Sequence, residues 1–369
     1  MKKRIFELIQ KLNKTNGLSV EEYEELLDGR TPEAAEYLAS LAVSHRKEYY
    51  GTSVFIRGLI EISNICKNDC YYCGIRRSNK NCNRYRLQPD EIIECANEGY
   101  ELGFRTFVLQ GGEDSFFSDD VLCEIITKIK ELHHDCAVTL SLGERTYESY
   151  KRLFECGADR YLLRHETADK EHYKKLHPDD MSFENRMNCL ENLREIGYQV
   201  GCGFMVGSPF QTNKNLAEDL KFIEKFSPDM CGIGPFIPHN ATPFRDFSAG
   251  SLELTLYCLS IIRLIKPNIL LPATTALGTI SPDGRERGIL SGANVVMPNL
   301  SPETQRKKYE LYNNKLFADE ESAQSLHKLS SKMKSIGYEI VVDRGDINLK
   351  RKRNLTQRKD KDNETGLQS

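Results

Sequence analysis

The chain has 369 residues, of which 39% are hydrophobic and 28% charged, an ordinary balance for a globular protein. Its formal net charge of -3 argues against a general affinity for nucleic acid or anionic membranes. No apolar run approaches the ~20 residues of a membrane span. Glu7, Gln10 and Lys11 interrupt the N-terminal segment, which therefore predicts an amphipathic helix and not a signal peptide. We expect a cytoplasmic protein with no nucleic-acid or membrane partner.

The first fifty residues predict three helices, over 3–12, 20–27 and 32–49. Ser19 before the second helix and Thr31-Pro32 at the third are typical N-cap and first-turn residues. Beyond residue 50, short β-rich runs alternate with amphipathic helical patterns. The expected strands cover 53–63, 106–110, 137–142, 160–166, 199–207, 230–238, 268–276 and 294–298. The expected helices between them cover 89–102, 119–133, 146–156, 183–196, 215–226, 251–266 and 283–290.

Eight strands that alternate with helices predict an α/β fold with a parallel sheet, and eight strands close a complete (β/α)8 TIM barrel. An open doubly wound sheet is the alternative. We expect an N-terminal helical extension (1–50), the barrel (51–300), a C-terminal closing segment (301–348) and a disordered tail (349–369). The closing segment should contain helices over 304–316 and 321–337 and a strand over 338–342.

The 12 cysteines are not spaced like a disulfide framework. Most lie singly inside apolar stretches, where cysteine behaves as a small hydrophobe. A reducing compartment suits such residues. The cysteines that lie singly in apolar stretches include Cys95, Cys123, Cys189, Cys202 and Cys258.

One cysteine group is clustered tightly enough to bind a metal. Cys66, Cys70 and Cys73 follow the first barrel strand in a C-x3-C-x2-C spacing. Three thiolates on one loop can ligate three irons of a [4Fe–4S] cluster and leave the fourth iron open to a small molecule. A structural zinc site needs four ligands, and Cys82 is the residue that could complete one. We assign the three cysteines as the metal ligands and catalytic residues.

The spacing, with aromatic Tyr72 before the last cysteine, resembles the signature of the radical S-adenosylmethionine (SAM) superfamily. That resemblance implies that Gly111-Gly112-Glu113, after the second strand, binds the methionine amino group of SAM. It also implies that Glu166 holds the SAM ribose and that Arg186 holds its carboxylate. Further cofactor contacts are expected along strands three, five and six, from Ser141, Met205, Met230 and Ile233.

Longer sequence segments resemble those of one family, the HydE maturases of [FeFe]-hydrogenase. They are VLQGGED (108–114), RYLLRHETAD (160–169), SFENRMNCL (182–190), GIGPFIPH (232–239), PATTALGT (272–279) and ANVVMPN (293–299). The resemblance covers roughly residues 50–315, with HNATPF (239–244) and Cys82 as departures. Some members carry a second iron–sulfur site near the C-terminus. No cysteine follows Cys258, so we expect one cluster and no second cluster.

Two related families are alternatives. Biotin synthase would carry an Asn-His-Asn-Leu-Asp-Thr type motif on the fourth strand, where this chain has Leu163-Arg164-His165-Glu166-Thr167. Methylornithine synthase is harder to exclude and is the enzymatic alternative. A non-catalytic iron–sulfur carrier is a different class of function, which would need no SAM pocket.

The resemblance to HydE implies that SAM accepts an electron and splits into methionine and a 5′-deoxyadenosyl radical. The implied substrate is an iron fragment that carries CO, cyanide and cysteine, delivered by HydG. Its processing leads towards the diiron subcluster, which is later assembled on the scaffold HydF. Reduced flavodoxin or ferredoxin is the expected electron donor.

Polar side chains that alternate with apolar ones along the strands predict donors inside the barrel, suited to an anionic substrate. Thr274 and Thr275 have a competing role, since they can bond to the backbone where their strand ends. An Arg–Glu pair at the barrel rim is likewise the alternative for the arginines of strand four. The expected substrate-binding residues are Arg57, Gln110, Thr139, Arg160, Arg164, Thr274, Thr275 and Tyr309, the last on a closing helix.

Overall fold

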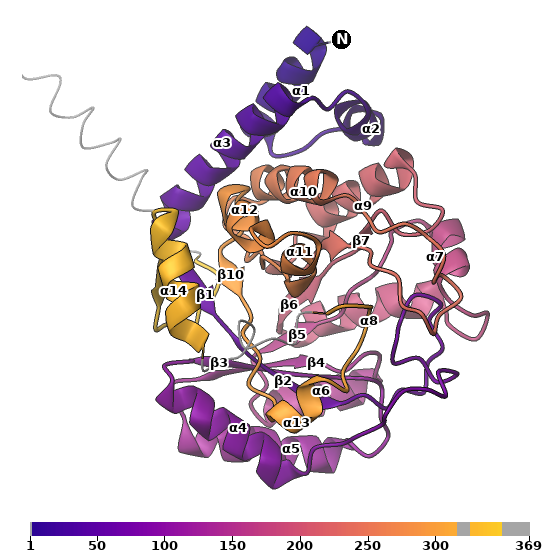
Figure 1. Cartoon of the computed structure of the whole chain (residues 1–369), viewed down its shortest axis with the longest axis vertical. Coiled ribbons are helices and arrows are strands. Elements are labelled where there is room, and N and C mark those ends of the chain that lie inside the picture. Colours follow the sequence, from indigo (N-terminus) through magenta and orange to yellow (C-terminus); the bar gives the residue numbers. More distant parts are fainter. Residues whose placement is uncertain (1, 316–324, 349–369) are drawn as a thin grey trace, which may run out of the picture.

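The computed structural model describes residues 2–315 and 325–348. Three helices open the chain, α1 (Lys2–Thr15), α2 (Val20–Asp28) and α3 (Pro32–Tyr50), as predicted. The Ser19 hydroxyl accepts a hydrogen bond from the Glu22 N–H, and the Thr31 hydroxyl accepts one from the Ala34 N–H. These helices lie over α9 (Asn213–Phe226) and α10 (Leu252–Ile265) at one side of the molecule (Figure 1).

The central sheet is parallel, with strand order β2-β3-β4-β5-β6-β8. Its strands are β2 (Gly58–Ser63), β3 (Thr106–Gly111), β4 (Ala137–Ser141), β5 (Arg160–Leu162), β6 (Gln199–Cys202) and β8 (Met230–Cys231). A second sheet has the order β10-β1-β11, and β7 pairs with β9. Their strands are β1 (Ser53–Ile56), β7 (Met205–Val206), β9 (Gly234–Pro235), β10 (Val295–Val296) and β11 (Glu339–Val341).

Several predicted strands differ from the structure. The run 160–166 is regular only as far as Leu162, and the runs 199–207 and 230–238 are divided into β6 and β7 and into β8 and β9. The run 53–63 is divided at Arg57, because β1 pairs with β10 and β11 whereas β2 pairs with β3. The run 268–276 makes isolated parallel bridges instead of a regular strand, Met230 with Leu270 and Pro272 with Val295. A third isolated bridge joins Leu59 of β2 to Asn299.

Helices follow the strands and cover the outside of the sheet (Figure 1). They are α4 (Pro89–Glu101), α5 (Asp119–Leu132), α6 (Tyr147–Glu155), α7 (Lys170–Leu176), α8 (Phe183–Ile196), α9 (Asn213–Phe226), α10 (Leu252–Ile265), α11 (Thr275–Ile280) and α12 (Gly284–Leu290). Most bury one apolar face, but α10 is buried on nearly all sides. Its outer side packs against α3 and α1, which explains why its sequence is apolar all round.

The closing segment differs most from expectation. The predicted helix over 304–316 is wrong, since α13 covers only Glu303–Arg306 and the chain then turns. The turning segment also bonds to loops that follow the strands: Gly74 N–H donates to Leu311 O at 2.8 Å, and Asn313 N–H to Pro238 O at 3.1 Å. The next helix in the described part of the chain is α14 (Leu326–Ser335), followed by β11, and the first four residues of the predicted helix over 321–337 lie outside that part. The tail over 349–369, predicted to be disordered, lies outside the described residues.

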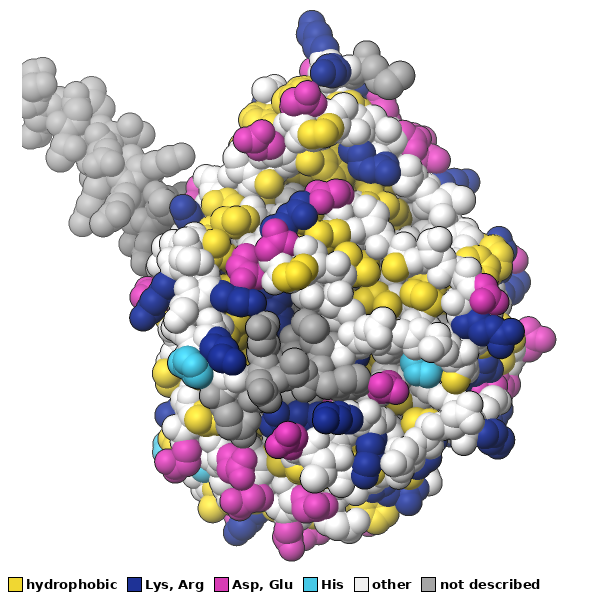
Figure 2. All heavy atoms as spheres, viewed as in Figure 1, with side chains coloured by type: hydrophobic (Ala, Val, Ile, Leu, Met, Phe, Trp, Pro, Cys, Tyr) yellow, Lys and Arg dark blue, Asp and Glu magenta, His cyan; other side chains and the backbone are white. Residues whose placement is uncertain are grey.

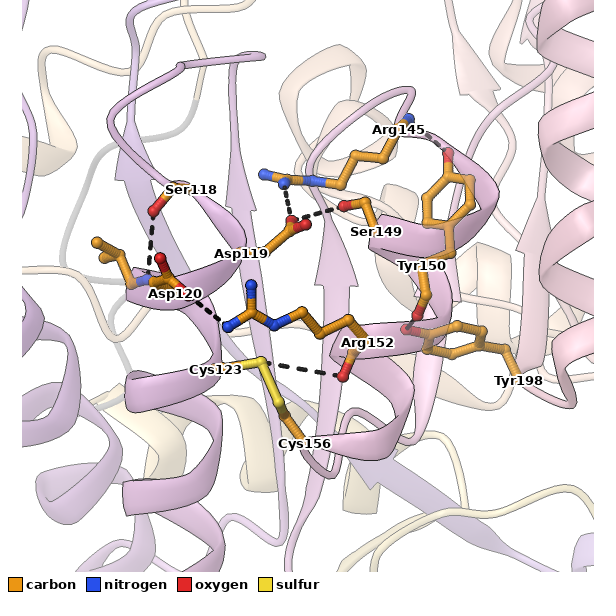
Figure 3. Close-up of a disulfide and its surroundings, with 11 residues drawn as sticks. Ser118, Asp119, Asp120, Cys123, Arg145, Ser149, Tyr150, Arg152, Cys156 and Tyr198 are labelled. Carbon is orange, nitrogen blue, oxygen red and sulfur yellow. Dashed lines mark hydrogen bonds and ion pairs between the residues drawn. A yellow bond between two sulfur atoms is a disulfide. The ribbon is translucent and has the colours of Figure 1, made fainter.

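A disulfide joins Cys123 of α5 to Cys156 at the end of α6 (Figure 3). The prediction that Cys123 is a lone hydrophobe is therefore wrong. The spacing of the cysteines in the sequence does not indicate this pair. The two residues are 33 apart in the chain, and the packing of α5 beside α6 brings them together. Arg152 and Asp120 form an ion pair across the same two helices (Figure 3).

The outer surface carries both signs of charge. On the face shown in Figure 2, basic and acidic side chains are interspersed and do not gather into one patch of a single sign. Among the described residues, no helix combines the length and the apolar character that crossing a lipid bilayer requires.

Candidate active site

The loop that carries the three cysteines leaves the C-terminal end of β2 and is held by its own charged residues. Asp69 accepts two hydrogen bonds from the Arg76 guanidinium, at 2.6 and 2.8 Å. This contact holds the pKa of Asp69 well below its usual range. Arg84 donates to the carbonyl oxygens of Ile75 and Arg76, at 2.7 and 2.6 Å. The turn that presents the thiols is thereby fixed on both sides.

The thiols lie at the inner side of this loop. The N–H groups of Asn68 and Glu113 both donate to Cys66 Sγ at 3.4 Å, a contact that favours the thiolate. Burial acts in the opposite direction: it raises the pKa of Cys70 to about 12 and that of Cys73 well above the ordinary value. Metal bound to the thiols would compensate for this burial, because it stabilises the thiolate form.

A cavity of about 340 Å³ opens at the C-terminal ends of the strands and joins these thiols to most of the predicted ligand-binding residues. Parallel strands end at the same edge, so residues that follow different strands meet there. The predicted residues that line it are Cys66, Cys70, Tyr72, Cys73, Gln110, Gly111, Gly112, Glu113, Ser141, Arg164, Glu166, Arg186, Met205, Thr274, Thr275 and Tyr309.

The Gly111–Glu113 turn lies against the cysteine loop. A Cβ on Gly112 would lie 2.2 Å from Ile65 O and 2.7 Å from Cys66 Cβ, so only glycine permits this close approach. Glu113 Oε1 accepts a hydrogen bond from Glu144 N–H at 3.0 Å, and its Oε2 lies 3.0 Å from Lys67 Nζ. The turn therefore presents a carboxylate beside backbone groups at the cavity wall.

Three further charged side chains, Arg164, Glu166 and Arg186, line the cavity. Arg186 of α8 is buried and donates to Glu144 Oε1 at 2.5 Å and to Arg164 O at 2.7 Å. Arg164 Nη2 lies 3.1 Å from Glu166 Oε2, although the two atoms are not aligned as a hydrogen bond. Buried polar atoms at the cavity wall are thus left for a polar ligand.

Tyr72 is oriented by His177, which the sequence did not indicate. The His177 Nδ1–H donates to Tyr173 O at 3.0 Å, since a carbonyl oxygen can only accept. Burial lowers the pKa of His177 to about 3, so the ring is neutral and its Nε2 is an acceptor. The Tyr72 hydroxyl therefore donates to this Nε2, at 3.2 Å.

Residues 309–315 form one side of the cavity. Gln110 Nε2 donates to the Tyr309 hydroxyl at 3.5 Å, although Tyr309 lies on a turn and not on the predicted helix. Lys315 forms a buried ion pair with Glu61 and donates to Tyr309 O at 3.0 Å. Sequence reasoning missed both charges. Glu61 could have been found, because it is a carboxylate in an otherwise apolar strand, whereas Lys315 gave no signal.

Five predicted residues do not line the cavity. Arg160 begins β5 and Met230 begins β8, so they lie at the N-terminal ends of the strands. There Arg160 pairs with Asp346 and donates to Thr106 Oγ1 at 2.9 Å, while Arg57 Nη1 contacts Met230 Sδ at 2.8 Å. The remaining two, Thr139 and Ile233, are buried within the fold.

The donor set fits an iron–sulfur cluster and SAM. Within residues 2–315 and 325–348, no three His, Cys, Asp or Glu side chains are gathered as ligands of one metal ion. A cubane cluster differs from such a site, because each thiolate binds a different iron and the ligands stand apart. Cys82 accepts a hydrogen bond from Asn64 Nδ2 at 3.5 Å and does not line the cavity, so a closed four-cysteine site is not formed.

Comparisons with known proteins agree with this geometry. Residues 60–223 match the model of the radical SAM superfamily, and the chain is a radical SAM enzyme. It is 50% identical over 281 residues to the [FeFe] hydrogenase maturase subunit HydE of Thermotoga maritima, covering 76% of this chain and 80% of that protein. The chain therefore belongs to the HydE family of [FeFe] hydrogenase maturases.

More distant relatives share the same fold. The chain is 31% identical over 293 residues to 3-methylornithine synthase of Methanosarcina barkeri, covering 79% of this chain and 82% of the relative. The crystal structure of methylornithine synthase (PylB) superposes with a TM-score of 0.80 at 28% identity, covering 90% of this chain and 97% of that one.

Proposed function

We propose that this enzyme cleaves SAM reductively and acts on an iron precursor that carries CO, cyanide and cysteine, in assembly of the diiron subcluster of [FeFe]-hydrogenase. One observation carries the proposal: a single cavity brings the three cysteine thiols together with Gly111–Glu113, Glu166 and Arg186. A reduced cluster bound there would supply the electron that splits SAM into methionine and a 5′-deoxyadenosyl radical.

The residues around the cavity have distinct roles in this proposal. Cys66, Cys70 and Cys73 hold the cluster. The Gly111–Glu113 turn binds the methionine amino group, and the Arg186 guanidinium binds the methionine carboxylate, a geometry that suits bidentate contact. Glu166 accepts hydrogen bonds from the ribose hydroxyls. The adenine packs beside Tyr72 and Met205, and Ser141 supports the methionine end.

The substrate occupies the part of the cavity away from the cysteine loop. Gln110, Thr275 and Tyr309 supply amide and hydroxyl groups there, and Arg164 adds positive charge. Such groups suit cyanide and carboxylate groups of a ligand. The Thr274 hydroxyl also lines the cavity, but it donates to Ile233 O at 3.4 Å and so can only accept a hydrogen bond from a ligand. We leave Arg57, Thr139, Arg160, Met230 and Ile233 out of the proposed site, because they do not line the cavity.

The remaining parts of the proposal concern the barrel, the number of clusters and the partner proteins. We propose that the bridges from β8 to β2 complete an eight-membered barrel, and that the enzyme carries one cluster, since no cysteine follows Cys258. HydG supplies the substrate, HydF receives the product, and reduced flavodoxin or ferredoxin supplies electrons. We propose a cytoplasmic location, which the ten free cysteines favour and the Cys123–Cys156 disulfide does not.

Two experiments test the function. The protein reconstituted with iron and sulfide should release 5′-deoxyadenosine from SAM on reduction, and Cys70→Ser should abolish the release. Cys82→Ser is the matched control, because Cys82 follows the same loop but lies outside the cavity. Absence of SAM binding and cleavage in the wild type would support a non-catalytic carrier instead.

Co-expression tests the place in hydrogenase assembly. Hydrogenase produced with HydF, HydG and this chain should be active, and it should be inactive when Cys70→Ser replaces the wild type. Activity without this chain contradicts the assignment. Methylornithine synthase is the second candidate, favoured by the overall superposition, and it predicts production of 3-methylornithine by the purified enzyme.

A further inference from the structure

Glu166 has an unusual backbone conformation. Its φ is +66°, in the left-handed region that residues other than glycine, asparagine and aspartate seldom adopt. Its N–H donates to Gly203 O at 3.0 Å, and it forms an isolated bridge with Phe204. Such a conformation persists only when neighbouring contacts enforce it, and it is found most often where function requires it.

One buried carboxylate holds the chain on both sides of Glu166. Asp219 of α9 is fully buried, and its Oδ1 accepts a hydrogen bond from Ala168 N–H at 2.6 Å. The same Oδ1 lies 3.3 Å from Nε2 of His165, which is also fully buried. Residues 165 and 168 therefore both contact the same atom of α9, Asp219 Oδ1, and Glu166 lies between them in the sequence.

His165 connects this contact to the next strand. Gly203 N–H donates to His165 Nδ1 at 3.3 Å, so Nδ1 carries no proton. Burial lowers the pKa of His165 to about 3, which keeps the ring neutral. The proton is then on Nε2, which donates to Asp219. His165 thus links β5, the end of β6 and α9.

Packing alone does not explain why an aspartate occupies position 219. Its Oδ2 is buried and has no hydrogen-bond partner among the described residues. A buried acceptor left in this state lowers stability, so packing by itself would favour an apolar side chain here. An apolar side chain could not make the contacts that Asp219 Oδ1 makes with residues 165 and 168.

We infer that Asp219 and His165 are positioning residues, which hold Glu166 in its left-handed conformation so that its carboxylate faces the SAM ribose. The inference rests on the proposed function, which places SAM in this cavity. Without the contacts to Oδ1, Glu166 relaxes to an ordinary backbone conformation and its carboxylate turns away. SAM affinity then falls, whereas the binding of methionine, which has no ribose, does not.

Equilibrium dialysis of the cluster-loaded enzyme against labelled SAM and labelled methionine tests this. Asp219→Leu removes the acceptor at similar volume, and Asp219→Asn keeps an Oδ1 acceptor. We expect SAM to bind roughly tenfold more weakly to the leucine variant, a change on the order of one hydrogen bond. The asparagine variant should recover most of the affinity, and both variants should bind methionine as the wild type does.

Each outcome of these binding measurements either supports or overturns the inference. SAM binding by Asp219→Leu equal to that of the wild type overturns the inference and leaves the proposed function standing. Equal weakening of SAM and methionine also overturns it, because the whole cavity is then disturbed. A wild type that binds no SAM contradicts the proposed function, and the inference falls with it. If Asp219→Leu fails to fold, His165→Gln, which keeps a donor for Asp219, and His165→Leu, which does not, make the same comparison.

Discussion

Replacement of Cys123 and Cys156 by serine should destabilise the fold measurably. The disulfide closes a loop with a sequence separation of 33. In the chain-entropy model, a loop of this length raises the free energy of unfolding by about 3.7 kcal/mol at 25 °C. Both side chains are only partly buried, so the serine hydroxyls themselves should lower stability little. The loss should therefore come mostly from the greater freedom of the unfolded chain.

The other contacts between α5 and α6 do not replace this contribution. Asp119 accepts from Ser149 at 2.6 Å and pairs with Arg145 at 3.0 Å, and Asp120 pairs with Arg152 (Figure 3). The Asp120–Arg152 pair is exposed and the Asp119–Arg145 pair partly buried, and surface ion pairs contribute at most about 1 kcal/mol each. They are also present in the variant. The disulfide thus dominates the difference between the two proteins.

Urea unfolding followed by circular dichroism measures the effect, with the wild type in reducing buffer as a matched control. The double variant and the reduced wild type should unfold at the same, lower urea concentration than the oxidised wild type. Peptide mapping without reductant should recover the two cysteines in one linked pair. Two free thiols at these positions, or equal unfolding midpoints for all samples, would refute the reasoning.

Three further changes have expected outcomes. Gly143→Ala places a Cβ 2.1 Å from Glu113 Oε1 at a φ of +75° and should weaken SAM binding, whereas Gly51→Ala, at a φ of +58° with open space around it, should leave SAM binding unchanged. His177→Gln should make stability less dependent on pH: below its ordinary pKa of 6.5, the unfolded chain binds a proton that the buried ring, with a pKa of about 3, does not bind. The wild type therefore loses about 1.4 kcal/mol of unfolding free energy per pH unit from this residue between pH 6 and 4, a slope that urea unfolding of the variant should lack. Lys315→Met leaves its carboxylate partner buried and unpaired and should lower the unfolding free energy by about 3–5 kcal/mol, and an undiminished urea midpoint would contradict the ion pair.

Local sequence was enough to predict the residues that follow strand ends. Cys66, Cys70 and Cys73 come after one strand, Gly111–Glu113 after the next and Glu166 after another, and parallel strands deliver all of them to one edge. Helix caps are equally local, which is why α2 and α3 begin at Ser19 and Thr31 as predicted.

Other features depend on contacts between distant parts of the chain, and the tertiary structure alone decided them. Alternation along a strand predicts which side chains point inwards, but not how deep they lie. Arg160 was expected in the cavity, yet it begins its strand and pairs with Asp346, 186 residues away in sequence. The disulfide, the Glu61–Lys315 pair and the contacts of Asp219 with residues 165 and 168 arise in the same way. Sequence determined the chemistry offered at the strand ends, and long-range packing determined which of those groups share the cavity and what holds them there.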